Sequence, residues 1–542
     1  MKNKIKIILP YLGIFALLAL CYNTVFRYDY AHHDELNFFL YGKKFIIHSV
    51  KDFVLAMGRF IGAYIATSLN YLVNSLDGLK VARFFMVVQL FVAASILMCW
   101  FKNNFLSKRD AFILSVLIFT LPSFEIMASF AAGFNNSTAL WVGLLSGIWA
   151  HKIPIAGNFL SRLRTREFVV SVVLFIAALM VYQPSAVIFW VIPAFLILFS
   201  SLSDFENTKQ RLINFFVAGF GSLGFYFVIL QSVKGNLMQL EGAYNPYHVT
   251  TDYFGKIQWF FSEVFVVCLN FWNVFPKKDY ALFWGGFIFT LALGVFLWRI
   301  QKARKDKNLK EVGAKIALLT CIFFVLLLLS FLPNLLSSGN SSFYRCLSGP
   351  TTIVLGVMIW LIWCWTKIIK KHQKNVFTFI LMGLMIFGLL KACKNVFRYI
   401  VYPGFIQVDV MKSVLRNNFY EYDRVHIIHS EKDKLQAYQD EFGFLSANLI
   451  QNRLGLVFCG YIETLKEDLN VLGIFFDYEK QEAEYLFTYK NDSKRGFAFK
   501  KVISSSLAGE PLLFDQPTIV VDMTRLYNPG GPLEYLKLPT KN

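Results

Sequence analysis

The sequence predicts a polytopic α-helical membrane protein of about eleven transmembrane helices, followed by a small extracytoplasmic α/β domain. Three observations predict this fold. First, 56% of the 542 residues are hydrophobic and only 16% are charged, against roughly 25% in soluble domains. Second, apolar runs long enough to cross a bilayer recur along residues 1–400. Third, the net charge is +22 over residues 1–403 and −3 over residues 404–542, so the C-terminal part differs in character.

The apolar runs define the predicted membrane domain, residues 1–400. They cover 5–26, 80–101, 110–130, 135–151, 167–182, 184–202, 211–231, 280–300, 314–335, 349–367 and 375–395. The first run follows three lysines, as in a signal peptide, but no small-residue cleavage site follows it, so we expect a retained helix. Pro184 interrupts the stretch 167–202, and we interpret that stretch as two helices. One long broken helix would move every later loop to the opposite side of the membrane.

Basic residues orient the predicted helices. With the N-terminus inside, the basic loops all face inside, as the positive-inside rule requires. These loops lie at 102–109, 152–166, 299–310 and 367–374. The outer segment 122–136 has no basic residue, and 336–348 has only Arg345. The basic balance therefore indicates membrane topology and contact with lipid headgroups rather than binding of nucleic acid.

Three outer segments are longer than simple connectors: 27–79, 232–279 and the tail after about residue 396. The first two contain amphipathic or aromatic stretches that suit helices lying in the membrane interface.

The tail, residues 401–542, changes character. The β-like runs 425–428 and 517–522 alternate with polar helical patterns at 433–442 and 462–472. This alternation predicts the small α/β domain on the outer side.

The strongest catalytic candidate is the acidic pair Asp34-Glu35, which follows directly on the first helix. A carboxylate at the membrane surface is ionised near neutral pH and can accept a proton from a hydroxyl nucleophile. A solvated loop is the simpler interpretation, but the position at a helix exit beside a long amphipathic loop favours catalysis. The preceding histidines include His33, from which we expect a hydrogen bond to a sugar or phosphate. Adjacent side chains rarely converge on one ion, so we expect no metal site.

Four further residues are candidates for substrate binding: Arg59, Tyr182, Gln183 and Arg345. Arginine binds phosphate bidentately, although Arg59 is equally consistent with a side chain that snorkels to lipid headgroups. Gln183 offers a donor and an acceptor to a sugar hydroxyl, or it belongs with Tyr182 to an ordinary helix-ending turn. The lone Arg345 suits a lipid phosphate or the anchoring of a helix end.

Other motifs give weaker signals. Glu125 is the sole acid of the segment 122–136, and a capping or solvated role is the main interpretation; the alternative is a place in one outer cavity with the candidates named above. No Walker loop, dinucleotide-binding GxGxxG or HExxH motif occurs, so we expect no cofactor. The cysteines form no CxxC pair, and we interpret Cys346 and Cys459 as unpaired thiols, with a disulfide between them as the alternative.

Taken together, these residues resemble the serotype-converting glucosyltransferase (glucosyl transferase II) group within the GT-C class of bacterial polytopic glycosyltransferases. The resemblance covers roughly residues 1–400 and is carried by the acids after the first helix, Gly58-Arg59, Tyr182-Gln183 and Arg345. It implies a polyprenyl-phosphate sugar as donor and a cell-surface glycan, such as the O-antigen of lipopolysaccharide, as acceptor. It also implies a site on the outer face of the inner membrane, facing the periplasm or exterior.

By the same resemblance, an acid of the first outer loop acts as the base on the acceptor hydroxyl, and a basic residue holds the leaving phosphate. The sequence has Asp-Glu where the family pattern is a pair of aspartates, which leaves open whether Asp34 or Glu35 is the base.

Three functions are compatible with these residues and this resemblance. The first is a hexosyltransferase, with glucose as the expected sugar and the donor lipid, the glycan acceptor and membrane lipids as partners. The second is a polymerase or ligase for O-antigen or another polysaccharide. The third is a lipid-linked glycan flippase or transporter, which is disfavoured because the candidate charges lie at the outer interface and no internal repeat is visible.

Overall fold

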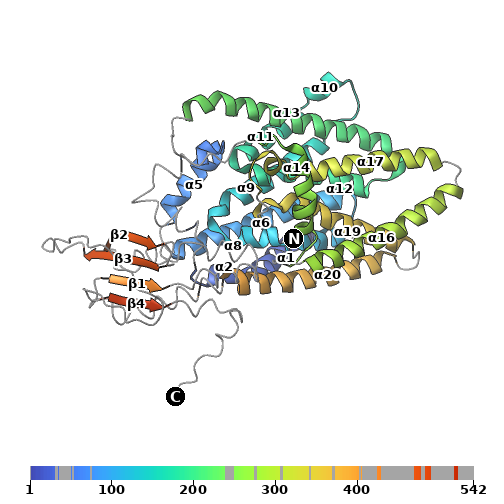
Figure 1. The fold of residues 1–542 in the computed structure, drawn as a ribbon. Coiled ribbons are helices and arrows are strands. Elements are labelled where there is room, and N and C mark those ends of the chain that lie inside the picture. Colours follow the sequence, from blue (N-terminus) through green and yellow to red (C-terminus); the bar gives the residue numbers. More distant parts are fainter. Residues whose placement is uncertain are drawn as a thin grey trace, which may run out of the picture. The chain divides into compact units, whose positions relative to one another are not determined.

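In the computed structural model the described parts of the chain are residues 2–30, 35, 51, 54–73, 76–237, 249–273, 278–305, 309–340, 344–368, 373–401, 405, 424–428, 469–477, 482–489 and 518–522 (Figure 1). Contacts divide the chain into two compact units. The first comprises Met1–Phe26, Ile46–Tyr71 and Val81–Val396. The second comprises Arg27–Phe45, Leu72–Lys80 and Phe397–Asn542, so it joins the tail with two short N-terminal segments.

Most of the described helices belong to the first unit. Their bounds are α1 (Lys2–Cys21), α2 (Asn23–Arg27), α5 (Phe60–Leu72), α6 (Leu76–Asn104), α7 (Lys108–Ile118), α8 (Pro122–Ser129), α9 (Phe134–His151), α10 (Phe159–Leu163), α11 (Arg166–Ala186), α12 (Val191–Phe199), α13 (Phe205–Leu237), α14 (Tyr253–Trp259), α15 (Phe265–Cys268), α16 (Lys278–Lys305), α17 (Leu309–Leu329), α18 (Leu332–Leu336), α19 (Ser348–Ile368) and α20 (Gln373–Asn395). Short 3-10 turns are η3 (Ala131–Gly133), η4 (Val187–Trp190), η5 (Leu202–Asp204) and η7 (Tyr344–Cys346), and two π-helical turns are η6 (Phe260–Val264) and η8 (Val396–Val401).

Six of the described helices are long and apolar enough to cross a membrane. They are Asp77–Asn104, Arg166–Phe199, Phe205–Ser232, Asp279–Phe296, Ser348–Ile368 and Asn375–Arg398. Shorter apolar helices occur at Ile7–Cys21, Phe60–Leu69 and Gly313–Leu329. The chain is thus a polytopic helical membrane protein, whereas the number of eleven spans stays a prediction.

The predicted span 110–130 is not one helix. It consists of α7 and α8, which are bent by 66° relative to each other. The physical reason lies in Pro122, which opens α8 and cannot donate the backbone hydrogen bond that would continue α7. The bent pair is either a broken span or a re-entrant segment, and both place irregular backbone inside the protein.

The stretch Arg166–Phe199 reverses direction within the bundle. It contains 34 residues, which would extend about 50 Å as one helix, well beyond the bilayer core. Along α11 the contacts to α9 run antiparallel, because Ala139 packs on Val181 while Ser146 donates to the Ser171 carbonyl over 2.7 Å.

After Tyr182 the contacts to α9 run parallel. Gly143 lies against Ala186, where a Cβ atom would be 2.5 Å from the carbonyl oxygen, and Gly147 lies against Ile192. The chain therefore turns back on α9 just after Tyr182, where the sequence analysis placed a turn between two spans. Figure 1 shows α9 beside α11 in the bundle.

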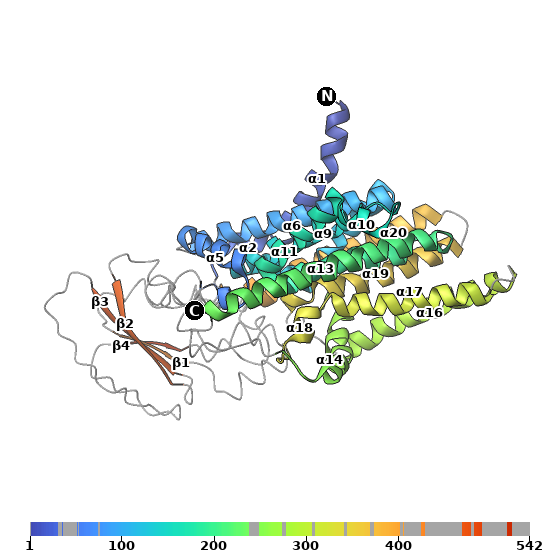
Figure 2. The same cartoon turned by 90° about the horizontal axis from the view of Figure 1, so that it is seen from above.

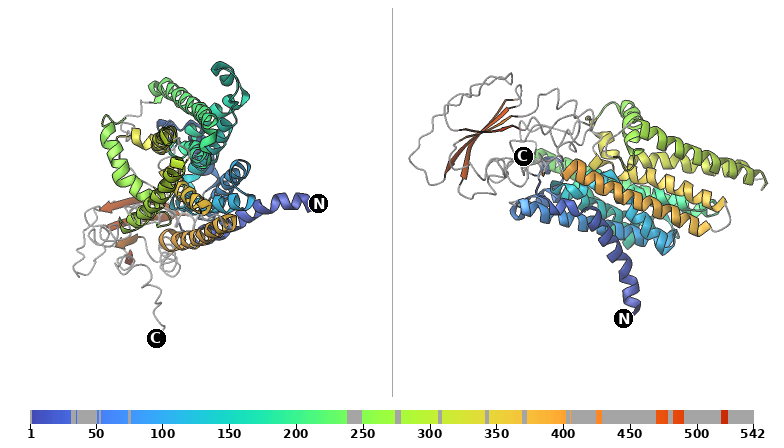
Figure 3. Two further views of the ribbon diagram at one scale, coloured as in Figure 1. Left: turned by 90° about the vertical axis from the view of Figure 1, so that its right-hand side faces the viewer. Right: turned by 90° about the horizontal axis from the view of Figure 1, so that it is seen from below.

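Burial of the helices differs with their place in the unit. In α12 all residues but one are buried, and it contacts α9, α17 and α19. In contrast, only 11% of the apolar stretch Asp279–Phe296 of α16 is buried. Helices α16 and α17 run side by side (Figures 2 and 3), and α16 packs on α19 through Val295, Leu361 and Cys364. Its other faces carry exposed phenylalanines and leucines, as expected of a helix in lipid.

Within the second unit, the described tail forms a four-stranded sheet of order β2-β3-β1-β4. Its strands are β1 (Arg424–Ile428), β2 (Leu469–Asp477), β3 (Glu482–Tyr489) and β4 (Thr518–Asp522). Strands β1 and β4 pair in parallel, with Arg424 opposite Thr518, and the other pairs are antiparallel.

The two β-like runs of the sequence analysis thus correspond to β1 and β4. The predicted helical pattern at 462–472 is wrong over residues 469–472, which begin β2 and pair with β3. Cross-strand pairing with β3 overrides the local helical pattern there. The other predicted helical pattern, 433–442, lies outside the described residues.

Candidate functional site

Gly58 fixes the backbone that precedes Arg59. Its φ of +68° lies in the left-handed region, and a Cβ atom there would be 2.3 Å from a methyl carbon of Leu230. The backbone N–H of Arg59 donates to the Val54 carbonyl over 3.2 Å, and α5 begins at the next residue. The pair Gly58-Arg59 is therefore a tight turn that sets Arg59 at the start of a helix.

The guanidinium of Arg59 is held by two consecutive residues of α11. Its Nε donates to Gln183 Oε1 over 3.0 Å, and its Cζ lies 4.3 Å from the ring centre of Tyr182. This is a cation–π contact combined with a directed hydrogen bond. Among the residues that the structure describes, no carboxylate forms an ion pair with Arg59.

The amide of Gln183 is oriented by a second set of contacts. Its Nε2 donates to the Met57 carbonyl over 2.8 Å and to Tyr226 Oη over 2.5 Å. Tyr226 Oη in turn donates to the Gly58 carbonyl over 3.2 Å. Since the NH2 group is occupied, the carbonyl oxygen of Gln183 faces Arg59. We call Arg59, Tyr182, Gln183 and Tyr226 the Arg59 cluster.

Tyr182 joins the Arg59 cluster to a second arginine. Its φ of −163° and ψ of 104° are extended, so the helix is interrupted two residues before Pro184. Its buried phenol lies 3.7 Å from the Sγ atom of Cys346, which follows Arg345 in η7. Both Arg59 and Arg345 lie close enough for their charges to act on this phenol. Arg345 Cζ itself lies 5.8 Å from the ring centre of Phe130.

Three of the four residues proposed from the sequence for substrate binding are in contact in the structure. Arg59, Tyr182 and Gln183 touch one another, and Cys346, the residue after Arg345, lies beside the phenol of Tyr182. Tyr226 was not among the residues predicted from the sequence. No sequence signal distinguishes its hydroxyl from those of other tyrosines in apolar runs.

The acidic candidates lie in a different part of the chain. Glu35 belongs to the second unit and is fully buried, contrary to the solvated-loop interpretation. Asp34 and His33 lie outside the described residues.

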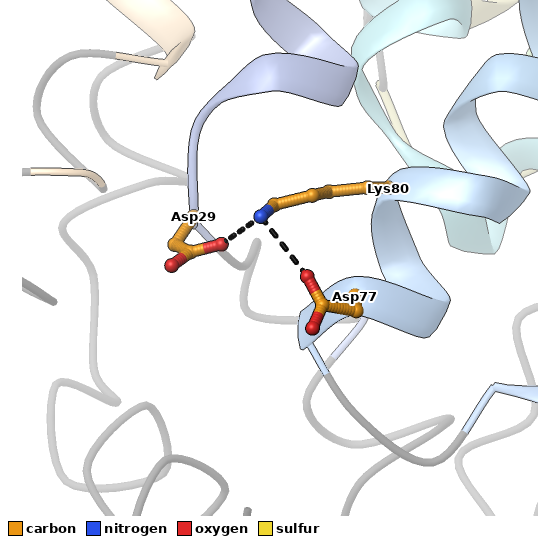
Figure 4. A network of polar contacts seen from close by, with 3 residues as sticks. All are labelled: Asp29, Asp77 and Lys80. Carbon is orange, nitrogen blue, oxygen red and sulfur yellow. Dashed lines mark hydrogen bonds and ion pairs between the residues drawn. The ribbon is translucent and has the colours of Figure 1, made fainter.

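An ion-pair cluster precedes Glu35 in the second unit (Figure 4). The ammonium of Lys80 pairs with a carboxylate oxygen of Asp29 and lies 3.0 Å from Asp77 Oδ1. The side chain of Asp29 is 24% exposed and that of Asp77 is 87% exposed, so the contact with Asp29 is the better shielded one. The ring of Tyr28, next to Asp29, packs edge-on against Phe405 and at a tilt against Phe397. These contacts fix the chain a few residues before Glu35.

Lys256 connects two segments that lie far apart in the sequence. Its Nζ donates to the Gly339 carbonyl over 2.8 Å and to Asn340 Oδ1 over 2.6 Å. Burial lowers the pKa of Lys256, against the opposing effect of Asp252. A bridge between Val249 and Ser337 lies beside it. The two hydrogen bonds of Lys256 are structural, because they satisfy its ammonium group with oxygen atoms of the protein.

Glu125 is fully buried rather than capping or solvated. Its Oε1 accepts from Asn395 Nδ2 over 3.3 Å, while Oε2 has no hydrogen-bond partner among the described residues. Lys391 lies close enough for its charge to act on this carboxyl group. The sequence signal that singled out Glu125 was its isolation in an apolar segment, and this signal did not reveal its burial.

Comparisons with known proteins complete the description of the site. No family model, curated protein or solved structure matches this chain. Within the described residues, no group of three or more His, Cys, Asp or Glu side chains is arranged to hold a metal ion.

Proposed function

We propose that this protein is a glycosyltransferase that moves a hexose, with glucose as the first expectation, from a polyprenyl-phosphate sugar to a cell-surface glycan such as O-antigen. The observation that carries the proposal is the Arg59 cluster with Arg345 beside it. One guanidinium group lies on the ring of Tyr182, the residue after Arg345 lies beside the same phenol, and among the described residues Arg59 has no carboxylate to neutralise it. Such a charge suits an anionic ligand, and planar guanidinium groups match phosphate.

The neighbours of Arg59 support a role in binding rather than in snorkelling. A snorkelling arginine extends freely to the headgroups, whereas Arg59 is fixed by a ring face and an amide oxygen. Its Nε makes that hydrogen bond, and the Nη atoms of a guanidinium group carry further N–H donors that suit a phosphate. Preorganised donors of this kind stabilise a leaving phosphate as its charge develops.

In the proposed reaction, a bond forms between the acceptor hydroxyl oxygen and the anomeric carbon, and the bond from that carbon to the phosphate oxygen breaks. The proton of the hydroxyl passes to a carboxylate, for which the family resemblance gives Asp34 or Glu35, and the polyprenyl phosphate leaves as an anion, which we expect an arginine such as Arg59 or Arg345 to bind.

The proposal includes a topology. We propose a GT-C-like membrane domain of about eleven spans, with residues 27–79 and 232–279 as outer loops and residues 401–542 as a periplasmic or exterior α/β domain in the bacterial inner membrane. The reversal of the chain after Tyr182 supports counting Arg166–Phe199 as two spans. That count keeps Arg59, Gln183 and Arg345 on one side of the membrane.

The test replaces the two acids singly, Asp34→Asn and Glu35→Gln, and compares surface glycans with those of a deletion strain by mass spectrometry. Loss of one side-branch hexose with unchanged chain length supports the transferase. A change in chain length supports the polymerase or ligase instead. Normal glycans in both variants rule out the acidic pair as the base.

One observation favours a second candidate, a lipid-linked glycan flippase or transporter. Transporters often place ionisable groups on broken helices inside the membrane, and Glu125 lies fully buried on the bent pair α7–α8. In proteoliposomes, translocation of a fluorescent polyprenyl-phosphate sugar without transfer of the sugar would support the transporter. Transfer to an added glycan without translocation would support the enzyme.

A further inference from the structure

The turn before α16 has an unusual backbone. Phe271 has a φ of +40°, in the left-handed region that residues other than glycine seldom adopt. Its ring and that of Trp272 are buried. Such a conformation persists only where surrounding contacts hold it. The carbonyl groups of the next two residues, Trp272 and Asn273, accept hydrogen bonds that supply this restraint.

On one side the turn is bound to α20 and α8. Asn395 Nδ2 donates to the Trp272 carbonyl over 2.9 Å and to Glu125 Oε1 over 3.3 Å. The indole of Trp272 donates to Thr120 Oγ1 over 2.9 Å. Thr120 precedes Pro122 and Glu125 follows it. The turn is therefore bound to both sides of the break between α7 and α8, directly at Thr120 and through Asn395 at Glu125.

On the other side the turn is bound to η7. Tyr344 Oη donates to the Asn273 carbonyl over 3.2 Å. Burial raises the pKa of Tyr344, and the charge of Glu125 acts in the same direction. Helix α8 packs on η7, and Phe130, the residue after α8, lies against Arg345.

We propose that Glu125 and Asn395 are positioning residues that set the place of Arg345. The inference rests on the proposed function, in which Arg345 binds the leaving phosphate. Glu125 acts as the hydrogen-bond acceptor that fixes Asn395. Asn395 then fixes Trp272, and the same turn fixes the tyrosine beside Arg345. Only an acceptor oxygen at position 125 is needed, so a glutamine serves as well as a glutamate.

Cys346 gives a readout that does not depend on activity. It is buried, free, adjacent to Arg345 and in contact with Tyr182. Full-length protein purified in detergent is treated with N-ethylmaleimide, and the Cys346 peptide is quantified by mass spectrometry. We expect Glu125→Leu and Asn395→Leu to label about tenfold faster than wild type, because η7 loses its restraint. Glu125→Gln should label at the wild-type rate.

A matched control exists at the other end of α7. Asp110 accepts from Thr378 Oγ1 over 2.5 Å, so it too links a buried acid to α20, but among the described residues it has no hydrogen bond to the turn at 271–273. Asp110→Leu should leave Cys346 protected. If Glu125→Leu does not fold, Asn395→Leu and Thr120→Val carry the same test.

Activity separates this inference from the proposed function. With a polyprenyl-phosphate sugar as donor, Glu125→Leu should raise the KM for the donor about tenfold, with the KM for the acceptor unchanged and Glu125→Gln normal. Protected Cys346 in Glu125→Leu and Asn395→Leu would overturn the positioning role, as would an inactive Glu125→Gln with protected Cys346. Wild-type protein without transferase activity, but with the expected labelling pattern, would refute the proposed function and leave the positioning of η7 supported.

Discussion

The guanidinium carbon of Arg59 lies 4.3 Å from the ring centre of Tyr182, 123 positions along the chain. The ring lies at the point where α11 stops being helical, and the next residue, Gln183, accepts a hydrogen bond from the same guanidinium. The contact therefore depends on a helix break at one end and a left-handed glycine at the other. Neither partner would be in place if its backbone were regular.

The first prediction concerns the shape of the Arg59 side chain. Arg59→Lys keeps the charge but loses the Nε donor and the planar face, so kcat/KM for a polyprenyl-phosphate sugar should fall about 10- to 100-fold. Steady-state transfer assays on purified protein measure this.

Arg162→Lys is the matched control for Arg59→Lys. Arg162 also bonds a glutamine, Gln210, over 2.9 Å, but this pair lies in a predicted inner loop. It should change kcat/KM less than about twofold. Equal losses in both variants would show that the effect at Arg59 is general destabilisation.

The second prediction concerns Gly58. Gly58→Ala forces a Cβ atom against Leu230 at a positive φ, and should lower the free energy of unfolding by about 1–3 kcal/mol. A thermal shift in detergent is the measurement.

Gly221 in α13 provides the control for Gly58→Ala, since a Cβ atom there meets nothing within 4 Å. Gly221→Ala should leave stability unchanged or raise it by up to about 1 kcal/mol, because alanine favours the helix. A Gly58→Ala variant as stable as wild type would contradict the strained turn.

The third prediction separates the two acids that contact Lys80. In double-mutant cycles, Asp29 and Lys80 should couple by about 1 kcal/mol or more, while Asp77 and Lys80 should couple by less than about 0.5 kcal/mol, since Asp77 is exposed. The charge swap Asp29→Lys with Lys80→Asp should restore part of the stability lost in each single variant. Equal coupling of the two acids would show that the pair with Asp29 is no better shielded.

The fourth prediction tests the proposed orientation. Topology reporters fused after residues 165, 240, 305 and 410 should report inside, outside, inside and outside, in that order. An inside signal after residue 410 would refute the orientation of the tail. An inside signal after residue 240 would show that Arg166–Phe199 crosses the membrane once.

The sequence was informative where the polarity of a side chain does not match the apolar segment around it. A polar side chain in an apolar segment is conspicuous, which is how Arg59, Gln183 and Arg345 were chosen, and the charge rule placed them on one side. That rule carries no distances, so the direct contact of Arg59 with Gln183 could not be foreseen. Tyr226 was beyond reach for another reason, since tyrosine is common in membrane helices whatever its hydroxyl does.

The positions of the helices were predictable from the sequence, but the angles between them were not. Apolar runs located α9, α19 and α20 within a few residues, because length and hydropathy determine a spanning helix. Pro122 was expected to mark a turn, but the run 110–130 was still predicted as one span, and its bend of 66° was not predicted. Proline shows where a helix is interrupted and leaves the bend angle to packing, here to contacts of α8 with η7 and α20. In the tail, pairing between distant strands decided the structure of residues 469–472.

The close approach of α9 to the chain beyond Tyr182 has a consequence for how this protein tolerates change. A Cβ atom at Gly143 would collide with a backbone oxygen, which cannot swing aside as a side chain would. A single added methyl in the middle of the bundle would therefore push away the segment that begins at Ala186, and Gln183 would be displaced with it. The geometry around Arg59 therefore depends on the contact between α9 and the segment after Tyr182. Random mutagenesis should find loss-of-function variants clustered in α9, at positions outside the proposed ligand contacts.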